Sequence, residues 1–137
     1  MQLDPQKVAE AREWLERASD DLREAEHDLT AAPPLVRGAV FHSQQAAEKA
    51  WKALLFWHDV PFRKTHDLRE LGSVCTRLDG SLRGLADRAE DLTQFAWLFR
   101  YPGAPQAPPA EEAREALLVA REVYEAILAR LPEEARP

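Results

Sequence analysis

Apolar residues recur along most of the chain at steps of three and four, the spacing of one face of an α-helix. The first stripe follows Asp4-Pro5, a pair typical of an N-cap with proline in the first helical turn. Its members are Val8, Ala11, Leu15, Ala18, Leu22, Ala25 and Leu29. The pattern predicts one long amphipathic helix, which Pro33-Pro34 separates from the next segment.

Two later segments repeat this spacing and are each predicted to form a long helix. One carries Leu82, Leu85, Ala89, Leu92, Ala96 and Phe99, and the other carries Ala113, Leu117, Ala120, Tyr124, Ile127 and Leu131. A shorter helix is predicted from about Asp67 to Leu78, with Thr65 or Asp67 as its N-cap. No segment shows the alternation of apolar and polar residues that predicts a strand.

The segment from about Leu35 to His58 has a different pattern, because its apolar residues cover more than half of a helical circumference. A helix of this kind is expected to be buried on several sides. Gln44 projects onto the apolar arc and is expected to be a buried amide with hydrogen-bond partners. Together the segments predict one all-α domain over residues 1–137, an up-and-down bundle of four long helices and one short helix.

Composition agrees with a small domain that folds without disulfides or a structural metal ion. Of the 137 residues 45% are hydrophobic, which is enough for a core. The lone Cys75 provides no disulfide framework and suits a reducing compartment. The first residues, MQLDPQK, do not show the basic-then-apolar order of a signal peptide, and the apolar runs of the chain are far shorter than the ~20 residues that span a bilayer. We expect a soluble, cytoplasmic protein without membrane contact.

Charge is distributed unevenly along the chain. The formal net charge is −6, which disfavours a basic protein that coats nucleic acid. Residues 1–32 carry a net charge of −5, residues 33–103 carry +2, and residues 104–137 carry −3. An anion is therefore expected to bind the middle of the chain.

The polar arc of the second predicted helix is one candidate contact surface. It contains His42, Gln45, Lys49 and Lys52, with Glu48 at its edge and Phe41 and Phe56 interleaved. Aromatic rings among polar residues favour contact with a protein or a nucleotide. The alternative interpretation is a solvated helix face with two exposed rings.

The connector before the short helix is a second candidate. Arg63, Lys64 and His66 lie where the helix dipole and free backbone N–H groups favour an anion, so the segment is a candidate phosphate site. The alternative is purely structural: Thr65 and Asp67 cap the helix while His66 forms a hydrogen bond with a nearby carbonyl.

No motif predicts a metal site or a bound cofactor. The four histidines, His27, His42, His58 and His66, lie in different segments without the His-x3-His spacing of helical zinc sites. Glycine-rich phosphate loops and nucleophile motifs are also missing from the sequence. The chemistry that remains open is acid-base chemistry by histidine together with arginine.

The run FHSQQAAEKAWKALLFWHDVPFRKTHDLREL at 41–71, followed by FRYPG at 99–103, resembles the HEPN family. Its most specific parts are QQAAEKA at 44–50, KTHDL at 64–68 and RYPG at 100–103. The resemblance implies a bundle of about this helix count that frequently forms a homodimer. It also implies a gene often found beside a minimal nucleotidyltransferase, as a toxin–antitoxin pair.

Ribonuclease members of that family use an arginine followed, after four to six residues, by a histidine. Arg100 stands in the matching place, but no histidine follows it in the sequence. Arg37 and His42 have the spacing, yet they project about 140° apart on a regular helix and are not expected to converge. Arginine binds phosphate but is too permanently charged to transfer a proton at neutral pH.

These observations predict a dimeric module that binds a nucleotide or a partner, with a minimal nucleotidyltransferase as the expected partner. The expected phosphate-binding residues are Arg63, Lys64, His66, Arg100, Tyr101, Lys49 and Lys52. The expected interface residues are Phe41, Phe56, Phe95, Trp97 and Leu98. One alternative is a metal-independent RNA endonuclease with Arg100, His66 and His42 as catalytic candidates. The other is a structural oligomerisation module.

Overall fold

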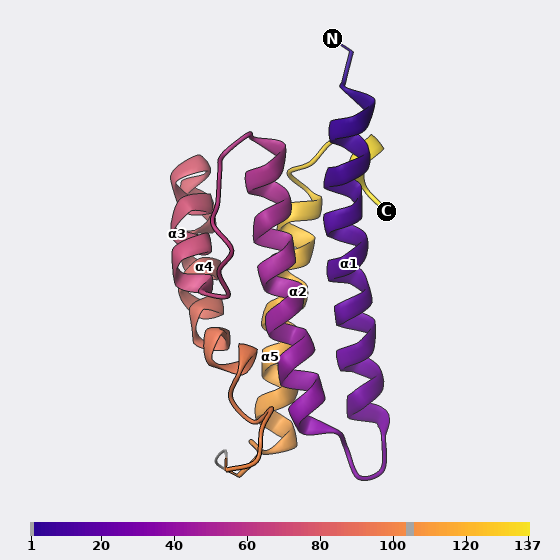
Figure 1. Ribbon diagram of the computed structural model, residues 1–137, viewed down its shortest axis with the longest axis vertical. Coiled ribbons are helices and arrows are strands. Elements are labelled where there is room, and N and C mark those ends of the chain that lie inside the picture. Colours follow the sequence, from indigo (N-terminus) through magenta and orange to yellow (C-terminus); the bar gives the residue numbers. More distant parts are fainter. Residues whose placement is uncertain (1, 104–105) are drawn as a thin grey trace.

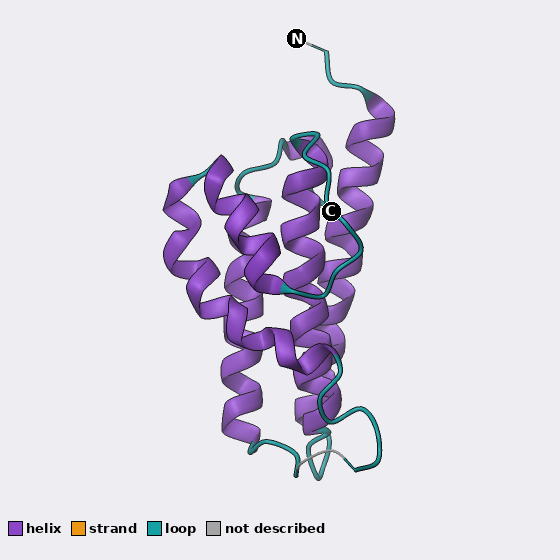
Figure 2. Cartoon of the chain, turned by 60° about the vertical axis from the view of Figure 1, so that its left-hand side comes forward, coloured by secondary structure: helices purple, strands orange, loops and turns teal. Residues whose placement is uncertain are grey.

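A computed structural model describes residues 2–103 and 106–137 and shows a helical bundle. Three long helices lie side by side along its long axis (Figure 1): α1 (Pro5–Thr30), α2 (Val36–Trp57) and α5 (Ala110–Leu128). The described residues form helices and loops without a strand (Figure 2), which confirms the all-α prediction. None of these helices combines the length and the apolar character needed to cross a membrane.

The shorter elements complete the bundle around these helices. They are α3 (Leu68–Leu78), the 3-10 helix η1 (Gly80–Leu82), α4 (Arg83–Ala89), the 3-10 helix η2 (Glu90–Ala96) and the 3-10 helix η3 (Glu133–Ala135). The start of α3 is capped as predicted, since the Asp67 side chain accepts a hydrogen bond from the Arg69 N–H. Asp4 caps α1 in the same way through the Gln6 N–H.

Helix α2 is the centre of the fold. It packs against α1, α3, α5 and η2, which is why its apolar residues extend around most of its circumference. Trp51, Leu54 and Leu55 are fully buried. The prediction that this helix is enclosed on several sides is therefore confirmed.

The long helix predicted over 82–99 is a wrong prediction. In the structure α4 ends at Ala89 and the chain continues as the 3-10 helix η2. Ala89, Leu92 and Phe95 are buried at steps of three, as expected where a 3-10 helix with three residues per turn continues α4. The bundle consequently has three long α-helices, and its fourth predicted long helix is a short one with a 3-10 extension.

The connection between α2 and α3 also departs from simple up-and-down topology. Residues 58–67 descend along the bundle before α3 begins, so that α3 runs parallel to α2 (Figure 1). A hydrogen bond of 3.1 Å from Gln44 Nε2 to the His66 carbonyl ties the lower end of this segment to α2. The descending segment thereby places a polar stretch of sequence directly on the most buried helix.

Candidate functional site

A buried carboxylate lies at the centre of the face that α2 turns toward residues 61–67. Glu48 is 5% exposed, and its Oε2 accepts a hydrogen bond of 2.9 Å from the buried Lys52 Nζ. Its Oε1 lies 2.8 Å from Nδ1 of His66. A charge in this position needs such partners, because burying an unpaired carboxylate is costly.

Two amides of α2 complete this network. Gln44 Nε2 donates to Glu48 Oε1 at 3.2 Å as well as to the His66 carbonyl, and Gln45 Nε2 donates to Gln44 Oε1 at 2.7 Å. Gln44 is fully buried with both ends of its amide satisfied, which confirms the expected buried glutamine. The amides hold the His66 backbone and the Glu48 carboxylate in one fixed arrangement.

The ring of His66 is held on one side and free on the other. Its side chain is 61% exposed while Nδ1 faces Glu48. In the neutral imidazole a proton on Nδ1 suits the carboxylate, which leaves Nε2 as an acceptor. None of the hydrogen bonds among the described residues involves Nε2.

Arg100 contacts the same helix at Phe41, about two turns before Glu48. Its guanidinium lies 4.4 Å from the centre of the Phe41 ring and 5.5 Å from that of Tyr101. A hydrogen bond of 3.1 Å from Nη1 to the Ala96 carbonyl fixes the side chain. No ion pair between described residues involves Arg100, so its charge remains available to an anion from solvent.

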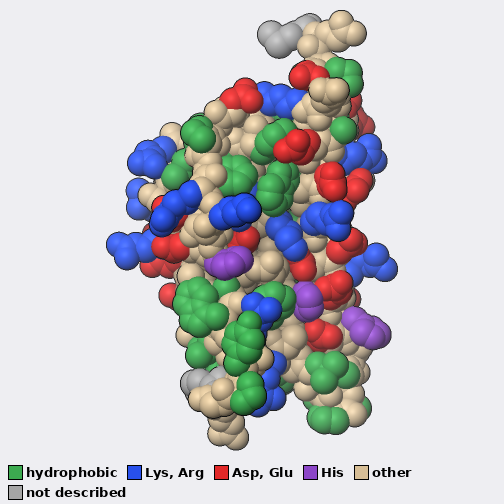
Figure 3. All heavy atoms as spheres, in the orientation of Figure 1, with side chains coloured by type: hydrophobic (Ala, Val, Ile, Leu, Met, Phe, Trp, Pro, Cys, Tyr) green, Lys and Arg blue, Asp and Glu red, His purple; other side chains and the backbone are tan. Residues whose placement is uncertain are grey.

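Arg100 and His66 therefore flank one face of α2, which we call the Arg100 face and define as Arg100, Phe41, Gln45, Glu48 and His66. Phe41 and Glu48 are seven residues apart, which corresponds to two helical turns and roughly 10 Å along the axis. In the space-filling view, Lys and Arg side chains form a band across the middle of the molecule, over α2 and the descending segment, with hydrophobic side chains gathered below (Figure 3).

Three of the predicted phosphate-binding cations are neutralised within the chain. Lys49 Nζ pairs with Asp21 of α1, Lys52 pairs with Glu48, and Arg63 Nε lies 3.0 Å from Glu70 Oε1. These three cations are thus paired within the chain, and their role as phosphate contacts stays a prediction. Lys64 and Tyr101 are exposed, and Tyr101 adjoins Arg100.

Two of the N–H groups at the start of α3 are already bonded within the chain. The Arg69 N–H donates to the Asp67 side chain, and the Leu68 N–H donates to Thr93 Oγ1 at 3.0 Å. Thr65 Oγ1 accepts from the Asp67 N–H. The capping interpretation of Thr65 and Asp67 therefore describes this turn better than the anion-site interpretation.

The predicted interface residues differ in exposure. Phe95 is 3% exposed and belongs to the chain's own core, so its assignment to an interface is corrected. Phe41, Phe56 and Leu98 are partly buried. Trp97 is exposed, which leaves it able to contact another molecule.

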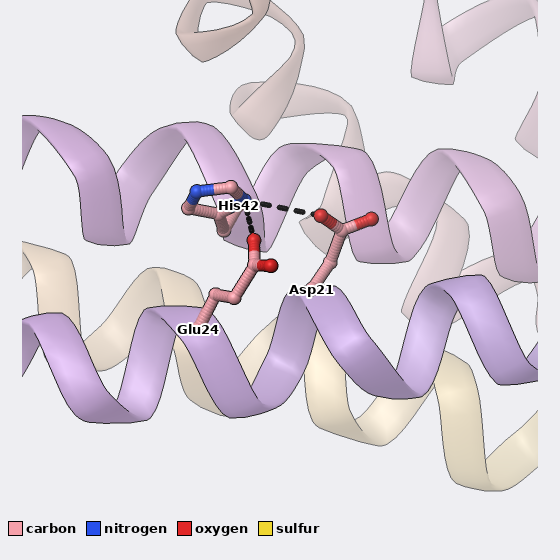
Figure 4. A group of neighbouring side chains, drawn as sticks. All are labelled: Asp21, Glu24 and His42. Carbon is pink, nitrogen blue, oxygen red and sulfur yellow. Dashed lines mark hydrogen bonds and ion pairs between the residues drawn. The ribbon is translucent and has the colours of Figure 1, made fainter.

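A second cluster lies where α2 faces α1. His42 Nδ1 is 3.0 Å from Asp21 Oδ1 and 2.9 Å from Glu24 Oε2, so that two carboxylates of α1 converge on one nitrogen of α2 (Figure 4). The hydrogen bond to Asp21 is the main reason that the pKa of His42 is raised, against the opposing effect of burial, and the charge of Glu24 adds to it. We call Asp21, Glu24 and His42 the His42 cluster.

Arg37 takes no part in this cluster or in the Arg100 face. Helix α2 is regular from Val36 onward, so Arg37 and His42 remain on different sides, as expected from their spacing. Arg37 is exposed, whereas His42 faces α1. The literal Arg-x4-His spacing here does not form a pair.

Sequence reasoning assigned no role to three of these residues: Asp21, Glu24 and Glu48. A signal for Asp21 was present, since it is three residues after Ala18 and four before Ala25 and so borders the buried stripe of α1. Glu48 follows the predicted buried Gln44 by one helical turn. A carboxylate beside a buried helix position is expected to have a charged or hydrogen-bonding partner.

Comparison with known proteins gives one clear result. A family model described as "HEPN domain" matches residues 11–131, nearly the whole chain. Neither a curated protein nor a solved structure matches the chain.

Proposed function

The chain belongs to the HEPN domain family, and from this premise we propose that it binds the phosphate groups of a nucleotide or RNA on the Arg100 face. Membership in the family supports a nucleotide- or RNA-related role in general terms. The observation that carries the proposal is the exposed guanidinium of Arg100, which lies over the Phe41 ring and has no carboxylate partner among the described residues.

The chemistry of these groups suits a phosphodiester. A guanidinium presents a planar fork of donors that matches two phosphate oxygens, and its stacking on an aromatic ring restricts its orientation before the ligand arrives. Tyr101 is 64% exposed beside it and offers a ring on which a base can stack. The face therefore provides a charge contact and a stacking contact, which together favour a single-stranded nucleic acid or a mononucleotide.

Replacing Arg100 tests this proposal. We expect Arg100→Ala to weaken the binding of a fluorescently labelled, single-stranded RNA by at least ~10-fold in an anisotropy titration, because hydrogen bonds to charged groups contribute about 1.5–3 kcal/mol. Arg114→Ala is the matched control: Arg114 is an exposed arginine on α5 whose removal changes the net charge equally. Equal losses in the two variants, or no RNA binding by the wild type, would contradict a specific phosphate contact.

Assembly is a further part of the proposal. HEPN domains often act as dimers and with partners, and we propose a homodimer that associates with a minimal nucleotidyltransferase in the cytoplasm, as a toxin–antitoxin pair. The exposed Trp97 and Tyr101 lie on one segment and suit a protein contact. Light scattering at micromolar concentration measures the mass, and a monomer argues against the dimer. Co-purification with a nucleotidyltransferase encoded beside this gene tests the partner.

The contact between Glu48 and His66 favours a second candidate function, metal-independent cleavage of RNA. A carboxylate on Nδ1 fixes the tautomer in which Nε2 accepts a proton, the state that a general base requires. Arg100 on the same face would bind the phosphate. This arrangement offers an imidazole in place of the histidine that the sequence lacks after Arg100.

Cleavage assays with a chelator distinguish this function from binding alone. We expect RNA to be cut in the presence of EDTA, and His66→Ala to lower the rate by ~10²–10⁴-fold while RNA binding remains. Because His66 is largely exposed, the variant is expected to fold. Intact RNA after long incubation with the wild type would remove the catalytic candidate and leave the binding function.

A further inference from the structure

An acidic hollow of about 910 Å³ opens beside the His42 cluster. Four carboxylates, Asp20, Glu24, Glu26 and Asp28, line it together with one arginine, Arg23. Glu24 and His42 belong both to the hollow and to the cluster, so the cluster is accessible from solvent. The negative charge of the lining favours a cation at this place, in contrast to the Arg100 face.

The geometry of the cluster is unusual for a simple ion pair. His42 Nδ1 is within hydrogen-bond distance of two carboxylate oxygens, Asp21 Oδ1 and Glu24 Oε2, yet a ring nitrogen carries at most one proton. Only the contact with Asp21 has hydrogen-bond geometry, so Glu24 Oε2 lies close to the ring nitrogen without a hydrogen bond to it. The nitrogen and one oxygen of each carboxylate point toward one another (Figure 4) and lie within 4.8 Å of each other, close enough for one cation to contact all three.

We propose that Asp21, Glu24 and His42 bind a divalent transition-metal ion of the zinc class. One imidazole nitrogen and two carboxylate oxygens form a ligand set that Zn²⁺ accepts. Zinc–ligand bonds of about 2.0–2.1 Å place tetrahedral donors about 3.3 Å apart. The observed separations from Nδ1, 3.0 Å and 2.9 Å, need to open by only a few tenths of an ångström. The hollow supplies solvent for the fourth position.

Neighbouring residues support such a site. Lys49 Nζ lies 2.5 Å from Oδ2 of Asp21, the oxygen that the cluster does not use, and so holds the carboxylate with Oδ1 toward His42. Asp21 and Glu24 are three residues apart on α1 and project from one side of that helix. The site joins α1 to α2 and is independent of the phosphate-binding proposal.

Calorimetric titration of the metal-free full chain with Zn²⁺ tests the proposal. We expect one ion per chain, with Glu24→Gln and His42→Gln each weakening the affinity by at least ~10-fold. Glu26→Gln and His27→Gln are matched controls, because both residues line the same hollow but lie outside the cluster. Glu24 is 56% exposed, so its variant is expected to fold, and circular dichroism checks this. Mg²⁺, which prefers six oxygen ligands, is expected to bind far more weakly than Zn²⁺.

The proposed site would be contradicted if the wild type bound no zinc or bound Mg²⁺ and Zn²⁺ equally well. It would also be contradicted if zinc affinity fell as much in the Glu26 or His27 variant as in the cluster variants, or fell only in His42→Gln. Substitution with Co²⁺ adds a readout of coordination, since the visible spectrum of the ion depends on its geometry. A spectrum that the Glu24→Gln variant leaves unchanged would also contradict the three-residue ligand set.

Discussion

The Arg100 face and the His42 cluster lie on two sides of the same helix, and in each of them a histidine contacts a carboxylate. On the Arg100 face, the buried Glu48 is already compensated by Lys52, so the charge that reaches solvent is the positive charge of Arg100. In the His42 cluster, only one of the two carboxylates, Asp21, pairs with a lysine, and carboxylates line the adjoining hollow. The sign of each surface therefore depends on which charges are neutralised inside.

The largest expected effect comes from breaking the internal compensation on the Arg100 face. Glu48→Ala leaves Lys52 buried without its carboxylate and is expected to lower the free energy of unfolding by about 3–5 kcal/mol. Urea denaturation measures this. The exposed pair Arg17–Glu13 is the control, because Glu13→Ala is expected to cost only about 0–1 kcal/mol.

A double variant sharpens the same test. In Glu48→Ala combined with Lys52→Met both charges are absent, and much of the lost stability is expected to return because no buried charge is left unpaired. If the double variant is as unstable as Glu48→Ala alone, the packing of the Glu48 side chain and its bond to His66 matter more than the charge of Lys52.

The next effect concerns the His42 cluster and rests on the proposed metal site. Zinc at about 100 times its dissociation constant is expected to raise the free energy of unfolding by about 2.7 kcal/mol, since it binds the folded chain. EDTA should reverse the gain, and Glu24→Gln at the same zinc concentration should show a far smaller one. Chemical denaturation with and without chelator measures both, and equal stabilisation of the two proteins would contradict the prediction.

The smallest effect is the pH dependence of the metal-free chain. Asp21, Glu24 and Asp28 raise the pKa of His42 above its ordinary value of 6.5, while Lys49 faces Asp21 from the same helix as His42. A raised pKa means that the stabilisation is fully present below about pH 6.5 and is lost as the pH rises through the folded-state pKa. We expect His42→Gln to lose this dependence in denaturation curves recorded with EDTA, whereas His66→Ala should keep it.

Much of the fold followed from the spacing of apolar residues. The stripe of α1, the enclosure of α2 and the caps at Asp4 and Asp67 were predicted correctly, because each depends on residues close in sequence. The prediction for the segment 82–99 was wrong although its apolar residues have the same steps of three and four as those of α1. Such a local pattern does not decide between an α-helix and an α-helix that continues as a 3-10 helix.

The candidate site was predicted only in part. Arg100 was identified from its motif, and in the structure its guanidinium lies over the Phe41 ring without an ion-pair partner among the described residues. Lys49 and Lys52 were expected to be free because they lie on a polar arc. In the structure Lys49 pairs with Asp21 of α1, and Lys52 pairs with the buried Glu48 of its own helix. Glu48 and Asp21 were overlooked because carboxylates in a charged sequence give no sign of burial on their own.

What the sequence by itself determined is the three long helices α1, α2 and α5, the short helix α3, the burial of α2 and the presence of arginine without a following histidine. Local spacing and capping decide these features, since the interacting residues are within one or two turns of each other. The tertiary structure alone decided that Lys49 pairs with Asp21 and which carboxylates contact a histidine. Those outcomes depend on pairs that are distant in sequence, such as His66 with Glu48 and His42 with Asp21, and on the descending course of residues 58–67.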